Sequence, residues 1–282
     1  MDLSVVLPAK NEGENLSKLL PRLKAVVPMA EIIVVDDGSS DDTVNICKEN
    51  NVKFISHVYS KGNGAAVKSG ARSAVGDVIV FMDGDGQHDP RDIPRLLETL
   101  ESGYDMVVGA RDSASQATAA RGIANSFYNK FSSWMVGQKV EDLTSGFRVV
   151  RKKKFLEFLY LLPNGFSYPT TSTMAFFRAG YSVGYIPIKA DKREGKSHIN
   201  IWRDGVRFLL IIFKVGTLYS PLKIFFPISL LQLFLGLGYY AYTFVEYHRF
   251  TNMSALLFTS SLLVFLMGLV SEQITSLQYK DD

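Results

Sequence analysis

Two long stretches near the end of the chain carry no charged side chain. Residues 224–245 are about 22 uncharged residues in a row, and residues 253–271 are about 19 more. Each stretch is long enough to cross a hydrocarbon core of roughly 30 Å as a helix. Two buried helices of that length would be unusual in a soluble fold. The short link EYHRFTN between them therefore predicts a helical hairpin that crosses a membrane twice.

The segment before the hairpin begins with basic residues and becomes amphipathic. Ile201 and Trp202 lie opposite Arg203 and Arg207 on a helical projection. This pattern is typical of a helix on a membrane surface, although a plain core helix has a similar one. The predicted parts are a catalytic domain at 1–198, a surface helix and linker at 199–220, and a transmembrane hairpin at 221–282 with spans at about 224–245 and 253–272.

The first 200 residues alternate short apolar runs with helical patterns. Strand-like runs are at 3–7, 31–35, 52–58, 77–82, 105–109, 143–150 and 182–188. Helix-like segments are at 12–26, 41–50, 64–74, 91–102, 116–137 and 168–179. This alternation predicts an α/β fold of the Rossmann-like kind, with a mostly parallel sheet and helices on both faces.

Polar loops follow three of the predicted strands. The loops read PAKNE after the first strand, DDGSSDD after the second and DGDGQHD after the fourth. Ligands bind beyond the carboxyl ends of the strands in sheets of this type. The three loops are therefore expected to converge on one ligand-binding edge.

Composition excludes some functions and indicates a compartment. The formal net charge of +3 is too small to indicate nucleic-acid binding. Cys47 is the only cysteine, so no internal disulfide can form, and we expect it to be a buried structural thiol. Met1-Asp2 leads directly into strand-like sequence without a secretory pattern. With Lys214 and Lys223 ahead of the first span, we expect an integral membrane protein whose catalytic domain is on the cytoplasmic face.

The stretch MDGDGQHD at 82–89 has several interpretations. A calcium loop is excluded because Gln87 and His88 stand at its fifth and sixth positions. Asp89 before a proline fits a helix cap. Alternate residues of an extended segment point the same way, so Asp83, Asp85 and Gln87 could converge on Mg²⁺ or Mn²⁺. A solvated acidic loop is the alternative.

The glycine-rich stretch KGNGAAVKSG at 61–70 fails two phosphate-binding patterns. Val67 stands where the Walker pattern and the dinucleotide pattern each require glycine. The glycines could still open a helix whose N-terminus faces an anion. A plain loop-to-helix turn is equally compatible with the pattern.

Several segments in this order resemble the inverting glycosyltransferases of family 2. They are VVLPAKNEGENL, IIVVDDGSSDDT, GNGAAVKSG, VIVFMDGDGQHDP, VVGAR, DLTSGFRVVRK and REGKSHIN, spread over about residues 3–200. The chain is most similar to the dolichyl-phosphate mannose synthase-like, polyprenyl-phosphate glycosyltransferase branch, which implies the GT-A fold. The C-terminal spans resemble those of enzymes that act on membrane lipids.

The resemblance implies four groups of site residues. The donor nucleotide would be bound by Pro8, Ala9, Glu12, Asp36, Asp37, Gly64 and Asp83. The metal would be held by Asp83, Asp85 and Gln87. The acceptor phosphate would be bound by Arg111, Arg121, Ser145, Arg148, Arg193 and Ser197, and the catalytic group would be Asp83, Asp85, Asp142 and Arg111. Many relatives have Lys where this chain has Asn63, so Lys61 would supply that basic contact.

The implied reaction is a metal-dependent, inverting transfer of a hexose from GDP-mannose or UDP-glucose to dolichyl or undecaprenyl phosphate. An acceptor phosphate is already anionic and needs no general base, and arginines suit it because they bind phosphate bidentately. A sugar nucleotidyltransferase would not need two spans, and a processive polysaccharide synthase would have more spans and a Q-x-x-R-W sequence. A membrane-anchored sugar-nucleotide-binding protein without turnover is the non-enzymatic alternative. The spans leave room for a homo-oligomer.

Overall fold

The computed structural model describes residues 2–111, 119–165, 168–189, 213–214 and 216–278. The chain divides into two compact units. The first contains residues 1–134 and 138–199, and the second contains residues 135–137 and 200–282. The predicted surface helix falls mostly outside the described residues.

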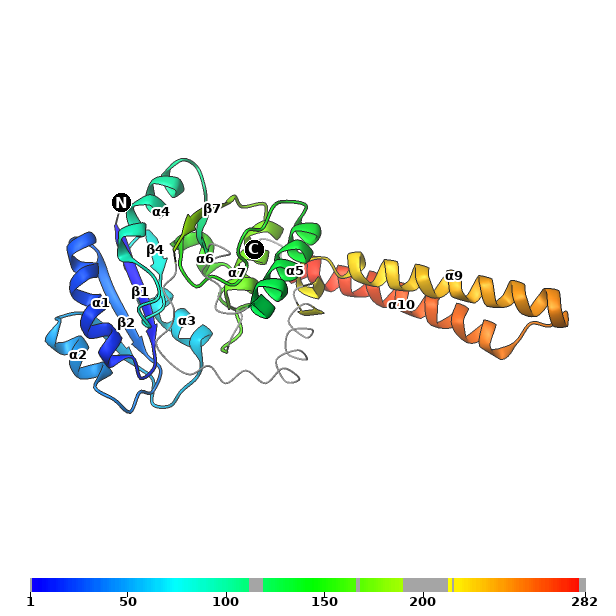
Figure 1. The fold of residues 1–282 in the computed structure, drawn as a ribbon, viewed down its shortest axis with the longest axis horizontal. Coiled ribbons are helices and arrows are strands. Elements are labelled where there is room, and N and C mark those ends of the chain that lie inside the picture. The colour runs from blue at the N-terminus through cyan, green and yellow to red at the C-terminus, as the bar shows by residue number, and fades with distance from the viewer. Residues whose placement is uncertain (1, 112–118, 166–167, 190–212, 215, 279–282) are drawn as a thin grey trace. The chain divides into compact units, whose positions relative to one another are not determined.

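The first unit is built on a seven-stranded sheet with the order β3-β2-β1-β4-β6-β5-β7 (Figure 1). Its strands are β1 Leu3–Ala9, β2 Glu31–Asp36, β3 Lys53–Ser56, β4 Val78–Phe81, β5 Met106–Arg111, β6 Arg148–Arg151 and β7 Val183–Ile188. Only β6 runs against its neighbours, β4 and β5. The prediction of a mostly parallel α/β sheet is confirmed.

Helices connect these strands close to the predicted positions. They are α1 Gly13–Val26, α2 Thr43–Glu49, α3 Asn63–Ser73, the short 3-10 turn η1 Pro90–Asp92, α4 Ile93–Glu101, α5 Ala119–Val136, α6 Lys152–Leu156 and α7 Tyr168–Arg178. Asp89 caps η1 by accepting a bond from the Arg91 amide at 3.0 Å, as its place before Pro90 predicted.

The strand predicted at 143–150 is wrong in its first half, because β6 begins only at Arg148. The amides of Thr144 and Ser145 both donate to the Asp142 carboxylate, at 3.0 and 3.1 Å. These two amides are bound to a side chain and are not available for a strand ladder. A local turn therefore replaces the start of the predicted strand.

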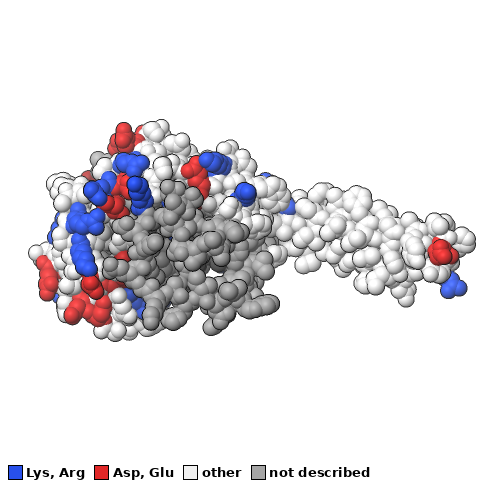
Figure 2. Space-filling model, viewed as in Figure 1, with Lys and Arg blue, Asp and Glu red and all other residues white. Residues whose placement is uncertain are grey.

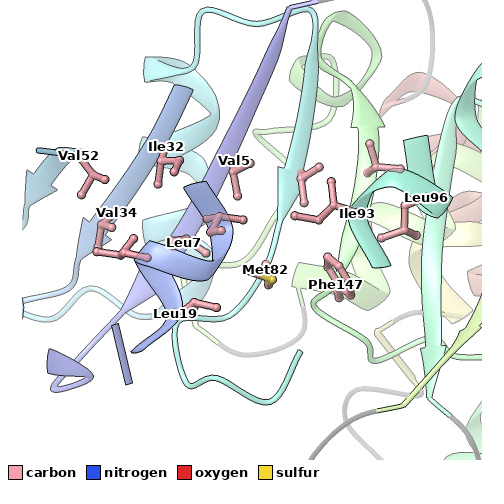
Figure 3. Packing of buried hydrophobic residues seen from close by; sticks show 14 of the residues in the cluster. Val5, Leu7, Leu19, Ile32, Val34, Val52, Met82, Ile93, Leu96 and Phe147 are labelled. Carbon is pink, nitrogen blue, oxygen red and sulfur yellow. The ribbon is translucent and has the colours of Figure 1, made fainter. Parts of the chain in front are cut away.

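Both faces of the sheet are covered, which explains the continuous apolar strands. On one face, Val5 and Leu7 of β1 pack in a buried cluster with Leu19 of α1 and Leu96 of α4 (Figure 3). Cys47 is fully buried in the same cluster, where burial raises the pKa of its thiol to about 11, so the predicted structural thiol is confirmed.

On the other face, α3 lies directly against the sheet. A Cβ atom at Gly70 would come within 2.2 Å of Cγ1 of Val6 and 3.2 Å of Cγ2 of Val35. Val6 alternates with Val5 and Leu7 along β1, so its side chain points to the opposite face. The glycine lets the helix backbone approach the strands closely.

The second unit contains two long apolar helices, α9 Pro221–Tyr247 and α10 Asn252–Gln278, which form a hairpin (Figure 1). Both have the length and composition to cross a membrane, and only 11% and 17% of their most apolar windows are buried. Figure 2 shows the hairpin surface as almost free of charge except at its tip. Core helices of a soluble protein would be mostly buried, so the predicted pair of exposed apolar helices is confirmed.

Buried small residues lie along both helices, and Ser229, Gly236, Ser261 and Gly268 contact the opposite helix. They recur at intervals of seven residues: Ser229, Gly236 and Thr243 on α9, and Ser254, Ser261, Gly268 and Thr275 on α10. The Ser261 hydroxyl donates to the Ser229 carbonyl at 2.8 Å. A seven-residue interval keeps these positions on one side of each helix, and small residues there let two backbones pack closely in an apolar medium.

Candidate active site at the carboxyl edge of the sheet

The loops after β1, β2 and β4 meet at one edge of the sheet. Ala9 and Asp36 are paired in register at the ends of β1 and β2. The Asp37 amide donates to the Ala9 carbonyl at 2.8 Å, and the Gly84 amide donates to the Pro8 carbonyl at 3.1 Å. The predicted convergence of the three polar loops is therefore present in the structure.

Asn11 joins the first two loops, a role that its place in the PAKNE motif did not predict. Its amide donates to Oγ of Ser39 at 2.9 Å, and its Oδ1 accepts the Ser40 amide at 2.8 Å. The backbone of Asn11 is left-handed, with φ 55°. Buried Asp36 closes the second loop by accepting the Ser39 amide at 2.9 Å. Glu12 follows Asn11 and is half-buried.

Asp37 holds the loop between β3 and α3. Its Oδ1 lies 2.7 Å from Nδ1 of His57 and accepts the Lys61 amide at 2.8 Å. Its Oδ2 accepts the Ser60 hydroxyl at 2.7 Å and the Gly62 amide at 2.8 Å. Burial raises the pKa of Asp37, but the bonds from His57 and the loop outweigh it and lower the pKa to about 2. Both oxygens of this predicted donor ligand are thus engaged within the protein.

The local packing requires a glycine at position 64. The amides of Gly64 and Ala65 donate to the carbonyls of Gly165 and Asn164, at 3.2 and 2.9 Å. A Cβ atom at Gly64 would lie 2.0 Å from the Pro163 carbonyl oxygen. The N-terminus of α3 is therefore covered by the 163–165 loop. Because this loop occupies the helix end, it leaves no room there for the predicted anion. The alternative prediction, a plain loop-to-helix turn, fits the observed structure.

The acidic loop after β4 turns sharply instead of staying extended. A turn forms at residues 84–85, and Gly86 takes a positive φ of 73°. The expectation that Asp83, Asp85 and Gln87 point the same way along an extended segment is therefore wrong. Asp85 accepts the Gln87 amide on Oδ1 at 3.2 Å, so the turn itself brings these two residues together.

The donor set of this loop nevertheless fits a hard cation. It offers two half-buried carboxylates, Asp83 and Asp85, and the amide oxygen of Gln87, all of which are oxygen ligands that suit Mg²⁺ or Mn²⁺. A Cβ atom at Gly146 would lie 2.5 Å from Oδ2 of Asp83, so the glycine leaves room for that carboxylate. Within the described ranges, no three His, Cys, Asp or Glu side chains gather as a metal site.

Arg111 ends β5 beside this loop and is held by Asp142. Its Nε and Nη2 donate to the two carboxylate oxygens at 2.8 and 3.0 Å, and Nη2 also donates to Oγ1 of Thr144 at 2.6 Å. Nη1 makes no hydrogen bond to any residue that the structure describes. Burial lowers the pKa of Arg111, but Asp142 and then Asp83 outweigh it and raise the pKa. A fixed, 29% exposed cation therefore lies beside the acidic loop.

Asp142 is saturated by these contacts. It is 5% exposed and accepts bonds from the Arg111 guanidinium, from the backbone amides of Arg111, Thr144 and Ser145, and from the Thr144 hydroxyl. Burial raises the pKa of Asp142, but the bonds from Arg111 and from the amides outweigh it and keep the pKa low. Asp142 thus holds the Arg111 guanidinium in place, and its predicted catalytic role stays a prediction.

Arg148 is fully buried and joins β6 to α7. Its Nη1 donates to the Pro169 carbonyl at 2.9 Å and the Ser172 hydroxyl at 2.8 Å, and its Nη2 donates to the Ser145 carbonyl. A guanidinium enclosed in this way cannot reach a ligand, which speaks against the predicted phosphate contact. Ser145 is buried too, and its hydroxyl has no partner among the described residues.

His88, which stands where a calcium loop requires glycine, is a buried residue of the acidic loop. It is 5% exposed, and its ring stacks on Phe147 with centroids 5.1 Å apart. Burial lowers its pKa to about 4, so the ring is neutral at pH 7. The ring supports the loop from the core side.

Three predicted acceptor residues cannot be placed. Arg121 is on the backbone of α5, but its side chain lies outside what the structure describes, and Arg193 and Ser197 fall outside the described residues. Their roles remain predictions.

Two family profiles match the chain. Residues 4–159, more than half of the chain, match the profile described as glycosyl transferase family 2. Residues 220–277 match the profile described as the GtrB C-terminal hairpin. The first match covers β1 through α6, and the second covers α9 and almost all of α10.

Curated relatives and solved structures agree with these matches. Glycosyltransferase AglJ of Haloferax volcanii is 26% identical over 97% of this chain and 93% of its own length. The polyprenol monophosphomannose synthase of Mycolicibacterium smegmatis is 28% identical over 67% of this chain and 77% of its own length. The glucosyl-3-phosphoglycerate synthase of Mycobacterium tuberculosis, solved with Mn²⁺, UDP and its product, has a TM-score of 0.59 at 20% identity, over 75% of this chain and 79% of that one. This structural likeness concerns the fold.

Proposed function

Because this chain belongs to glycosyl transferase family 2, we propose that it transfers a hexose from a nucleotide sugar to a polyprenyl phosphate, with inversion at the anomeric carbon. The products would be a lipid-phosphate-linked sugar and a nucleoside diphosphate. GDP-mannose and UDP-glucose are the candidate donors, and dolichyl and undecaprenyl phosphate are the candidate acceptors.

The observation that carries this proposal is the place of Arg111. Asp142 fixes its guanidinium beside the acidic loop, and Nη1 is left without a protein partner among the described residues. A pre-oriented guanidinium binds a phosphate without first losing side-chain freedom. The acceptor phosphate would therefore be held next to the leaving diphosphate, with Arg121, Arg193 and Ser197 as proposed further contacts.

The donor would lie across the loops after β1, β2 and β4. Pro8, Ala9, Glu12 and Asp36 would contact the nucleoside, since they gather at the ends of β1 and β2. Asp83, Asp85 and Gln87 would hold Mg²⁺ or Mn²⁺, as their oxygen donors allow. The metal would neutralise charge on the diphosphate. The solved relative that binds Mn²⁺ and UDP supports this choice by its fold.

The chemistry needs positioning more than proton transfer. An oxygen of the acceptor phosphate attacks the anomeric carbon while the bond to the diphosphate breaks on the opposite face, which inverts the configuration. The attacking phosphate is already anionic, so no residue has to act as a general base. This agrees with an Asp142 carboxylate that is wholly occupied by Arg111 and by backbone amides.

The hairpin is the basis for proposing a lipid acceptor. Its exposed apolar helices have the length to cross a bilayer, and they match the GtrB hairpin profile. The relative from Mycolicibacterium smegmatis is named as a polyprenol monophosphomannose synthase. We propose that the hairpin anchors the enzyme in the membrane, with the catalytic domain on the cytoplasmic face.

A direct test uses the full-length chain purified in detergent. It is incubated with Mg²⁺ or Mn²⁺, a polyprenyl phosphate and each of several radiolabelled nucleotide sugars. Label in the organic phase, lost when the metal is chelated, is the expected result. If every donor leaves the organic phase unlabelled while the protein still binds a nucleoside diphosphate, the non-enzymatic binding function would replace the proposal. Release of labelled sugar 1-phosphate from the nucleotide sugar when inorganic pyrophosphate is added would indicate a nucleotidyltransferase.

A further inference from the structure

We propose that Tyr59 and Lys61 form the platform on which the base of the donor nucleotide stacks. This inference rests on the proposed function and assigns the residues that select the base. It depends on three observations: the loop that carries the two residues is rigidly held, the two side chains face solvent as a pair, and the loop adjoins the proposed nucleoside site.

The loop between β3 and α3 is fixed to the second polar loop. The Ser60 hydroxyl and the amides of Lys61 and Gly62 all donate to the Asp37 carboxylate, at 2.7 to 2.8 Å. Gly38, with φ 71°, packs so closely that a Cβ atom there would lie 2.9 Å from the Ser60 amide nitrogen. A loop with this many contacts presents its side chains in one place.

Tyr59 is 68% exposed at the tip of this loop. Nζ of Lys61 lies 5.6 Å from the centre of its ring, which is within cation–π distance. An exposed aromatic ring contributes little to a core. Its face is suited to stacking on a planar ligand, and any of the nucleobases can stack on an aromatic side chain because each has a π-face.

The position of the loop identifies which planar ligand this is. Ser56, at the end of β3, pairs in register with Asp36 at the end of β2, and the His57 amide donates to the Asp36 carbonyl at 2.9 Å. Tyr59 thus lies on the same sheet edge as the loops proposed to bind the nucleoside. The base is the planar part of that ligand.

Lys61 adds a preference among bases. An ammonium group can only donate hydrogen bonds. Guanine and uracil present ring carbonyl oxygens that accept such bonds, whereas the exocyclic group of adenine is a donor. The pair should therefore favour guanine and uracil nucleotides over adenine nucleotides.

The test measures binding of GDP, UDP and ADP to the full-length protein by calorimetry with Mg²⁺ present. We expect Tyr59→Ala to raise the Kd of the preferred nucleotide roughly 5- to 150-fold, the range of one base–aromatic stack. Tyr59→Phe, which keeps the ring, should recover most of the affinity. Met29→Ala, an exposed apolar residue ahead of β2 at the opposite edge, is the control and should bind as the wild type does.

Two further measurements separate this inference from the proposed function. Inorganic pyrophosphate with Mg²⁺ has no base, so its affinity should be the same in the wild type and in Tyr59→Ala. Lys61→Met should reduce the ratio of the Kd for ADP to the Kd for GDP or UDP. Equal nucleotide binding by the wild type and Tyr59→Ala would overturn the inference and leave the function standing. A wild type that binds no nucleoside diphosphate would overturn the function itself.

Discussion

Asp37 carries a charge that the fold needs, because four donors converge on its carboxylate. Since the side chain is 6% exposed, water cannot replace those donors, and ionisation is favoured strongly enough to lower the pKa to about 2. The group thereby links folding to pH. Its ordinary pKa of 3.8 applies in the unfolded chain, so the folded state holds the proton less tightly.

Replacing Asp37 by Asn should therefore have an effect that depends on pH. A lowered folded-state pKa stabilises the protein fully above about pH 4, and the contribution is lost as the pH falls towards 2. From the shift, we expect Asp37→Asn to lower the free energy of unfolding by about 2 kcal/mol at pH 7. The difference from wild type should shrink to about half near pH 3. Thermal unfolding across pH 3–7 measures it, and a difference that does not change with pH would contradict the assignment.

Arg111 should be sensitive even to a change that keeps its charge. Lysine cannot make the two parallel bonds to Asp142, so Arg111→Lys should leave the cation free to move. We expect the KM for polyprenyl phosphate to rise roughly 10- to 150-fold, the effect of one charge-assisted hydrogen bond, while the Kd for nucleoside diphosphate stays the same. Arg151→Lys, at the end of β6 that pairs with the start of β4, is the matched control. Equal effects of both variants would remove Arg111 from the acceptor site.

At the scale of elements, the contact between α3 and the 163–165 loop depends on Gly64 having no side chain. Gly64→Ala would bring a Cβ atom to 2.0 Å from the Pro163 carbonyl oxygen, so the loop or the helix must move. We expect a loss of about 1–3 kcal/mol of stability, typical of an overpacked contact. Gly165→Ala tests the other side of the contact, where a Cβ atom meets nothing within 4 Å, and should change stability by less than about 0.5 kcal/mol. Similar unfolding temperatures for the two variants would disprove the close approach.

The hairpin offers a second matched pair of glycines. A Cβ atom at Gly268 would lie 2.7 Å from Cβ of Phe225, whereas one at Gly238 would meet nothing within 4 Å. Both positions are inside long helices, so valine costs a similar helix propensity at each. Gly268→Val should lower the unfolding temperature of the protein in detergent by several degrees, and Gly238→Val should leave it nearly unchanged. Equal shifts would mean that the small residues spaced at seven-residue intervals on α9 and α10 do not hold the hairpin together.

At the scale of the whole molecule, a hairpin that spans a membrane places both of its ends on one side. Cys47, the only cysteine, is fully buried, so introduced cysteines can be labelled with little background. Phe250→Cys reports on the link between α9 and α10, and Lys153→Cys reports on the catalytic domain. In intact cells, an impermeant maleimide should label only Phe250→Cys, and permeabilisation should be needed for Lys153→Cys. The reverse pattern would place the catalytic domain outside.

Patterns that repeat along the chain determined the architecture. Apolar runs alternating with helical spacing predicted the layered sheet, and two uncharged stretches predicted the hairpin, because periodicity and length are properties of neighbouring residues. The polar loops were also identified correctly, since the direction of parallel strands places their carboxyl ends together. These features needed no knowledge of distant contacts.

The tertiary structure decided which of the polar groups are available for chemistry. Asp37 is satisfied by His57, Asp142 by Arg111, and the N-terminus of α3 by the 163–165 loop, and each contact joins residues far apart in the chain. Arg148 has the same charge as Arg111, yet burial makes one structural and leaves the other 29% exposed. The sequence shows which residues can bind a ligand. Only packing decides whether another part of the protein has already bound them, because that depends on where the chain returns in space.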